Sequence, residues 1–227
     1  MVTTDYMEPA SALVLGPTGG IPRGRTTVRM WKLSTMEITQ TINVTKVTGR
    51  THRGNYTGFM DVKFIPGDPS GRSFANGGGV IYLIDPVAGT AEPTYVFASP
   101  EVGPCVLAIS ADGTRLWGTL NTWGQVYMFD ASRPEKLAVL DVLELGPFSG
   151  PHFMLLLEPK EDRIVVANYF IQMPPDMGVI APPADYKVRV ANLTENGTRM
   201  VLDEGFDVDF DNLPGVPPSN PHGLAYL

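Results

Sequence analysis

The sequence predicts an all-β fold, specifically a β-propeller built from four-stranded antiparallel blades. Three observations predict it. A motif of apolar strand, polar turn with arginine and second apolar strand recurs, a third strand with its own pattern follows each copy, and no stretch of ten or more residues carries a helical stripe. Four strands per unit, in units of roughly 40–50 residues, are typical of propellers. A β-sandwich with accidental internal similarity is the alternative.

The first and second strands of each unit carry the clearest repeat. Residues 106–110 and 116–120 flank a turn that ends in Arg115, and residues 153–157 and 164–168 flank a turn that ends in Arg163. A looser copy occupies 60–64 and turns toward Arg72. The arginines are 43 and 48 residues apart. This spacing is that of propeller blades.

The third and fourth strands of each unit repeat as well. Alternation and β-branched residues between Gly, Pro and Asp turns favour strands at these positions. The third strands are expected at 28–32, 80–85, 126–130 and 188–192. The fourth, more exposed strands are expected at 39–44, 94–98, 138–143 and 199–203.

These strands group into a single domain, 1–227, of about four blades. The blades are expected at 1–44 plus 221–227, 59–98, 105–143 and 152–210. Residues 1–6 resemble a second strand, and 221–227 resemble a first strand, so the last segment is expected to complete the first blade. Such closure protects sheet edges. The alternative is that the chain forms part of a larger, seven-bladed ring.

Composition excludes several classes of function. The net charge of −7 disfavours binding to nucleic acid, because an acidic surface repels phosphates. The longest apolar run has five residues, 153–157, which is too short to span a bilayer. Residues 1–12 do not read as a secretory signal, and one cysteine excludes an internal disulfide framework. These features favour the reducing cytoplasm. If the chain starts upstream of Met1, the periplasm or another compartment is the alternative.

Potential metal ligands occur at matching places in three repeats. Cys105, His152 and His222 each directly follow a proline that stiffens the approach to an inner strand. The corresponding place in the remaining blade falls at Met60 or Asp61, of which Asp61 is preferred. Inner strands line the central channel, so these side chains are expected to converge on one point. Two histidines with a cysteine suit copper, whereas histidine with carboxylate suits zinc or iron. The alternative is that these side chains form the channel wall.

Other candidate residues are weaker. His52 lies between arginines and is expected in a solvated loop. Trp123 and Tyr169 follow second strands and are expected at the opposite rim, over a pocket or packed between blades. Residues 173–184, rich in proline, form a long insertion that is interpreted as a lid or a loop for a protein partner.

Several segments together resemble one known family. They are 1–6, 30–41, 60–64, 107–116, 127–134, 150–152 and 220–225. They are similar to the C-terminal half or more of the selenium-binding protein and methanethiol oxidase family, whose members are propellers. Family members are about twice as long. Their N-terminal cysteine-containing region, linked to selenium binding, has no match in this chain, so Cys105 does not inherit that role.

The resemblance implies an oxidoreductase that acts on a sulfur group. It implies copper as cofactor, a small thiol as substrate and dioxygen as electron acceptor, with an association with selenium as a further expectation. His152 and His222 would then be the catalytic residues, and His152, His222, Cys105 and Asp61 the metal ligands. The alternative is a non-catalytic propeller that binds proteins, a shortened relative without the activity. A lactonase or other hydrolase with a divalent metal is a third hypothesis.

Overall fold

The structure, a computed structural model, confirms the all-β prediction. It describes residues 1–4, 25–45, 47, 58–98, 106–121, 123–147, 149–157, 159–169, 184–217, 219 and 221–225. These residues form four antiparallel sheets, with one short 3-10 turn, η2 (Glu195–Gly197), and no α-helix in the described part. In that part no helix has the length and apolar character needed to cross a membrane.

Each sheet contains strands that follow one another along the chain. The first has three: β1 (Val2–Thr4), β2 (Thr27–Lys32) and β3 (Glu37–Asn43). The second has β4 (Phe59–Phe64), β5 (Ser73–Gly77), β6 (Val80–Asp85) and β7 (Thr90–Val96). The third has β8 (Leu107–Ile109), β9 (Arg115–Leu120), β10 (Gln125–Asp130) and β11 (Ala138–Glu144). The fourth has β12 (Pro151–Leu156), β13 (Arg163–Asn168), β14 (Lys187–Thr194) and β15 (Arg199–Asp209).

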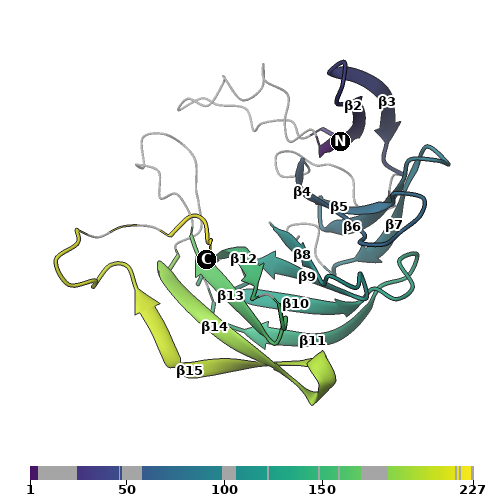
Figure 1. Cartoon of the computed structure of the whole chain (residues 1–227). Helices are drawn as coiled ribbons and strands as arrows, with labels where there is room; N and C mark the ends of the chain where they lie inside the picture. Colours follow the sequence, from purple (N-terminus) through teal and green to yellow (C-terminus); the bar gives the residue numbers. More distant parts are fainter. Residues whose placement is uncertain are drawn as a thin grey trace.

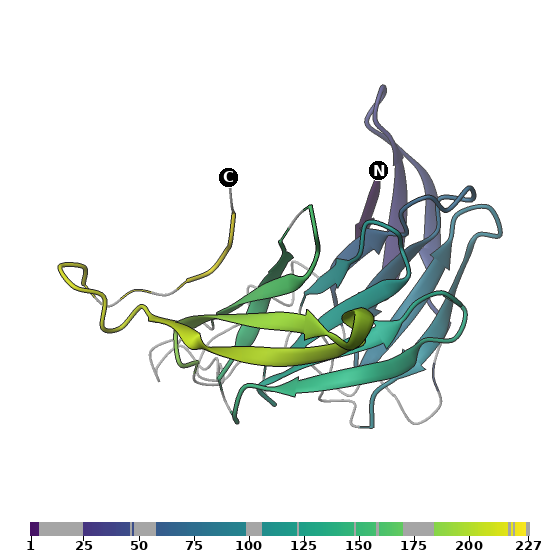
Figure 2. The ribbon, with the colours of Figure 1, turned by 60° about the horizontal axis from the view of Figure 1, so that its bottom comes forward.

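The sheets are the blades of a β-propeller. They succeed one another in an arc, with β4, β8 and β12 on the inner side and β7, β11 and β15 on the outer side (Figure 1). The second view shows the same succession of sheets from the first to the fourth (Figure 2). Within the described residues, no strand of the first sheet pairs with a strand of the fourth. The described part is therefore an arc of a ring.

The C-terminal segment does not complete the first blade, which differs from the expectation for 221–227. Residues 221–225, the described part of that segment, form no strand, and the first sheet has three strands. Backbone hydrogen bonds explain the difference: the Phe210 N–H donates to the Tyr186 carbonyl at 3.1 Å, and the Ser219 N–H donates to the Phe210 carbonyl at 3.3 Å. These bonds hold the chain after β15 beside the fourth blade.

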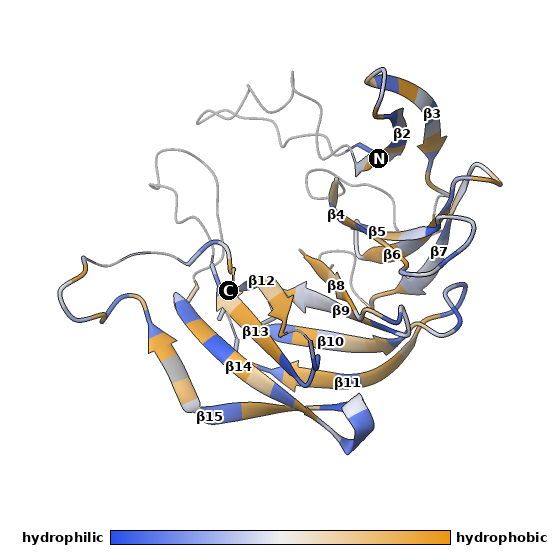
Figure 3. Ribbon diagram, in the orientation of Figure 1, coloured by the Kyte–Doolittle hydropathy of each residue, from blue (hydrophilic) through white to orange (hydrophobic). Residues whose placement is uncertain are grey.

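Apolar side chains fill the spaces between successive blades. Three clusters of buried residues lie between the first and second, second and third, and third and fourth blades. In that order they include Val28 and Ile84, Phe74 and Phe129, and Trp117 and Met154. The first five residues of β6 are all buried, which explains its continuous apolar run. Apolar residues run along β11, β12 and β13, whereas in β2, β3 and β14 they alternate with hydrophilic residues (Figure 3).

Candidate functional site

The register at the start of the inner strands identifies equivalent positions in two blades. His152 in β12 and Met60 in β4 each occupy a bulge, where the pairing with the second strand shifts by one residue. Bulges of this kind re-aim a side chain and often lie beside functional sites. Met60, which is 40% exposed, is therefore the counterpart of His152. Asp61, the residue preferred from the sequence, lies one position further along the strand.

Asp61 ties two blades together through its carboxylate. Its Oδ2 accepts a hydrogen bond from the N–H of Leu107 in β8 at 2.9 Å and lies 3.2 Å from Lys63 Nζ. Its Oδ1 accepts from the Val62 N–H at 2.8 Å. Both oxygens therefore bind donors in the structure, and the bond to Leu107 joins the second blade to the third. This arrangement favours a structural role for Asp61 over the ligand role expected from the sequence.

His152 and His222 lie together although 70 residues separate them in the sequence. Their rings are nearly parallel, with an interplanar angle of 20° and centroids 5.3 Å apart. His152 comes from the inner strand β12 and is half-buried, whereas His222 comes from the C-terminal segment and is exposed. The tether of that segment to the fourth blade brings the two imidazoles together.

Tyr169 is the third ring of this group. Its centroid lies 4.4 Å from that of His222 and 5.6 Å from that of His152. We call His152, Tyr169 and His222 the ring cluster. The sequence analysis expected Tyr169 at the opposite rim, over a pocket or between blades. Antiparallel pairing explains its actual place, because the end of β13 lies beside the start of β12, and the Tyr169 N–H donates to the Gly150 carbonyl at 2.8 Å.

Burial favours the neutral form of His152. Desolvation, followed by the positive charge that His222 can carry, lowers the pKa of His152 below its ordinary value of 6.5. Neutral imidazole is the form that binds metals, and it binds them without first losing a proton. The ring cluster thus provides one imidazole that is poised as a ligand near neutral pH.

The lowered pKa of His152 predicts a dependence of stability on pH. In the unfolded chain the group titrates near 6.5, so between 6.5 and the lower folded value the unfolded state binds more protons. We expect the free energy of unfolding to fall as the pH is lowered through this window, and less so in His152→Gln. Urea unfolding at several pH values between 5 and 7.5 measures this. The same dependence of the free energy of unfolding on pH in wild type and His152→Gln would contradict the lowered pKa of His152. His52→Gln is the control, because the sequence places His52 in a solvated loop, and it should behave like wild type.

Several predicted residues lie outside the part of the chain that the structure describes. Cys105 and His52 are among them, as is the insertion 173–184 except for Ala184. Across the described ranges, no group of three or more His, Cys, Asp or Glu side chains is arranged to hold a metal ion. The described residues therefore supply two imidazoles, and Cys105 stays a prediction from the sequence.

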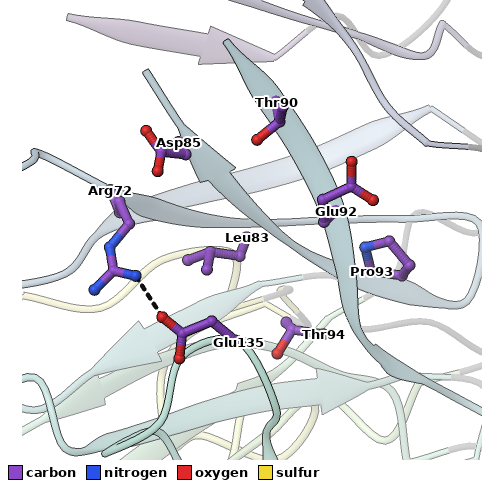
Figure 4. Close-up of a pocket in the computed structure, with 8 residues that line it drawn as sticks. All are labelled: Arg72, Leu83, Asp85, Thr90, Glu92, Pro93, Thr94 and Glu135. Carbon is purple, nitrogen blue, oxygen red and sulfur yellow. Dashed lines mark hydrogen bonds and ion pairs between the residues drawn. The ribbon is translucent and has the colours of Figure 1, made fainter. Parts of the chain in front are cut away.

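A cavity of about 350 Å³ is lined by none of the residues of the ring cluster (Figure 4). Its lining comes from β6, β7, Arg72 before β5 and Glu135 before β11. Arg72 crosses between two blades, with Nη1 2.6 Å from Glu135 and Nη2 2.7 Å from Asp68. The hydrogen bond from Arg72 lowers the pKa of Asp68 below its ordinary value. The pKa of Glu135 is lowered first by a hydrogen bond from its own backbone and then by Arg72. None of the predicted site residues lines this cavity.

Comparisons with known proteins find similarity in structure and none in sequence. No protein-family model matches the chain, and no curated protein matches it. A hypothetical selenium-binding protein from Sulfolobus tokodaii superposes with a TM-score of 0.66 at 17% identity, over 92% of this chain and 52% of that one. A protein from Lactobacillus plantarum gives 0.61 at 16% identity, over 96% of this chain and 57% of that one.

A periplasmic gluconolactonase from Pseudomonas aeruginosa is also similar. Its TM-score is 0.57 at 17% identity, over 82% of this chain and 50% of that one. At such identities the likeness confirms the β-propeller fold and carries no activity from one protein to another. The relation to the selenium-binding protein is a distant relation of fold. The chain spans about half the length of these neighbours.

Proposed function

We propose that this propeller binds copper at His152 and His222 and oxidises a small thiol with dioxygen, in the manner of methanethiol oxidases. The observation that carries the proposal is the pair of nearly parallel imidazoles, 5.3 Å between centroids, at the start of an inner strand. These are two of only three histidines in the chain. Because the two side chains come together from distant segments, they support the binding of one shared metal ion.

The chemistry of the neighbouring residues fits copper. Imidazole binds copper well, and cysteine and methionine sulfur bind its reduced form. Met60, the counterpart of His152 in the second blade, is a thioether, and Cys105 is expected at the same place in the third. His152 and His222 would hold the ion and the sulfur side chains would complete its surroundings. Bound copper would supply one-electron chemistry between a thiol and dioxygen.

The protein's own residues favour a small thiol. Tyr169 places an aromatic ring beside His222, and sulfur makes favourable contacts with aromatic rings at about 5 Å. His152 is half-buried, and burial lowers its pKa. At neutral pH, protons would therefore compete little with the ion for this imidazole. His222 is exposed, so this side of the cluster is open to a small molecule from solution.

Copper binding by histidine variants tests the proposal. We expect wild-type protein to bind one copper ion per chain in a chelator-competition titration. Each of His152→Ala and His222→Ala should lower the affinity by more than about 100-fold, since loss of an outer partner alone costs about 10- to 100-fold. His52→Ala is the matched control and should bind like wild type. Oxygen uptake with methanethiol should follow copper loading in the same proteins.

Two results would contradict the proposal. One is copper well below one ion per chain in wild type after reconstitution. The other is an equal affinity in all four proteins. Full copper binding without thiol-dependent oxygen uptake would refute the oxidase activity and leave a metal-binding propeller.

A further inference from the structure

Asp185 holds together the backbone segments that carry two members of the ring cluster. Its Oδ1 accepts hydrogen bonds from Asn168 Nδ2 at 2.8 Å and from the Lys187 N–H at 3.2 Å. Its Oδ2 accepts from Arg189 Nη2 at 2.6 Å, and its own N–H donates to the Ser149 carbonyl at 3.1 Å. One side chain and its backbone therefore join β13, β14 and the segment before β12.

The partners of Asp185 are neighbours of the rings. Asn168 directly precedes Tyr169, is fully buried and pairs with Pro151, which directly precedes His152. Ser149, three residues before His152, is 4% exposed. A shift of Asp185 would therefore move the buried backbone that carries Tyr169 and the backbone that precedes His152. In the contacts described, Asp185 itself touches none of the three rings.

The connection between the second and third strands is much longer in the fourth blade than in the second and third blades. Paired residues at the end of the second and the start of the third strand are Gly77 and Val80 in the second blade, and Leu120 and Gln125 in the third. Turns of two and four residues join them. In the fourth blade, residues 169–186 separate β13 from β14. Short turns fix the ends of the strands that they join, whereas strand ends joined by a longer connection depend more on other contacts. In the described residues, the Asp185 contacts are of that kind.

We propose that Asp185 is a positioning residue that holds His152 and Tyr169 in the geometry of the ring cluster, acting through Asn168 and Ser149. The charge of Arg189 strengthens this role. The Arg189 side chain is 14% exposed, and Asp185 is its ion-pair partner in the described residues. Both carboxylate oxygens are in use, so an asparagine with a single acceptor oxygen cannot keep the contacts to both Asn168 and Arg189. The expected effect of Asp185 on copper affinity rests on the proposed function, whereas its effect on the ring geometry does not.

The test compares Asp185→Asn with Asp68→Asn. Asp68 and Arg72 form an ion pair at the same i, i+4 spacing, at 2.7 Å, in the second blade and outside the ring cluster. In metal-free wild type we expect nuclear Overhauser contacts between the Tyr169 and His222 rings, whose centroids are 4.4 Å apart. Asp185→Asn should lose these contacts and bind copper about 10- to 100-fold more weakly. Asp68→Asn should keep both properties.

The outcomes separate this proposal from the proposed function. Ring contacts that survive in Asp185→Asn, or that are lost equally in Asp68→Asn, would overturn the positioning role. Ring contacts that depend on Asp185 in a protein that binds no copper would support the positioning role and refute the proposed function. If Asp185→Asn does not fold, Arg189→Lys tests the same network, with Arg72→Lys as its control, and ring contacts unchanged in Arg189→Lys would overturn the proposal.

Discussion

Phe129→Ala is expected to lower the free energy of unfolding by about 3–5 kcal/mol, the usual cost of truncating a buried phenylalanine. Phe129 lies on β10 and is fully buried in the cluster between the second and third blades. Its ring centroid is 4.8 Å from that of Tyr95 and 5.9 Å from that of Tyr127. The variant removes both the apolar contacts and these ring contacts, and it leaves a cavity between two blades.

Equilibrium urea unfolding measures this effect. Phe64→Ala is the matched control, because Phe64 is 50% exposed at the end of β4, and its loss should cost about 1 kcal/mol or less. A midpoint for Phe129→Ala equal to that of Phe64→Ala would contradict the packing of the second blade against the third. A uniform loss in both variants would do the same.

Asp61→Ala is expected to lower the free energy of unfolding by about 2–3 kcal/mol, because the hydrogen bond of Asp61 that joins two blades has a charged acceptor and such a bond is worth about 1.5–3 kcal/mol. The variant leaves the N–H groups of Leu107 and Val62 without their acceptor and removes the bond between β4 and β8. Copper affinity should stay at the wild-type value, since Met60 and not Asp61 is the counterpart of His152.

Asp85→Ala is the control for Asp61→Ala, because it removes hydrogen bonds within one turn and, in the described residues, none between blades. The Asp85 carboxylate also accepts from two backbone N–H groups, Val87 and Ala88, but both belong to its own exposed turn. We expect its loss to cost about 1 kcal/mol or less. Urea unfolding and copper titration of both variants make the comparison. A loss of copper affinity in Asp61→Ala alone would restore Asp61 as a ligand and contradict the structural role assigned here.

The repeat explains why so much of the fold was predictable. Most residues of the middle strands β6 and β13 are buried, so the runs 80–84 and 164–167 are apolar at fixed places after the arginine turns. The position of His152 relative to the turn at Arg163 followed from the same repeat. Local patterns of this kind are visible in a sequence because each strand depends mainly on its neighbours in the same blade and the next.

The remaining features depend on single contacts that no repeat encodes. The choice between Met60 and Asp61 required the bulge in β4, which shifts the register by one residue. The place of His222 required the hydrogen bonds of Phe210 and Ser219, which turn the chain toward the fourth blade. The place of Tyr169 could have been predicted from the sequence, because antiparallel pairing puts the residue after a second strand at the same rim as the residue before the inner strand.

The central claim is that His152 and His222 share one ion, and pulsed electron paramagnetic resonance of the copper(II) protein tests it most directly. The remote nitrogen of each bound imidazole gives its own modulation, so the number of imidazole ligands can be counted. We expect two imidazoles in wild type and in His52→Ala, and one in each of His152→Ala and His222→Ala. A wild-type spectrum with fewer than two imidazoles, or one unchanged by both replacements, would contradict the account.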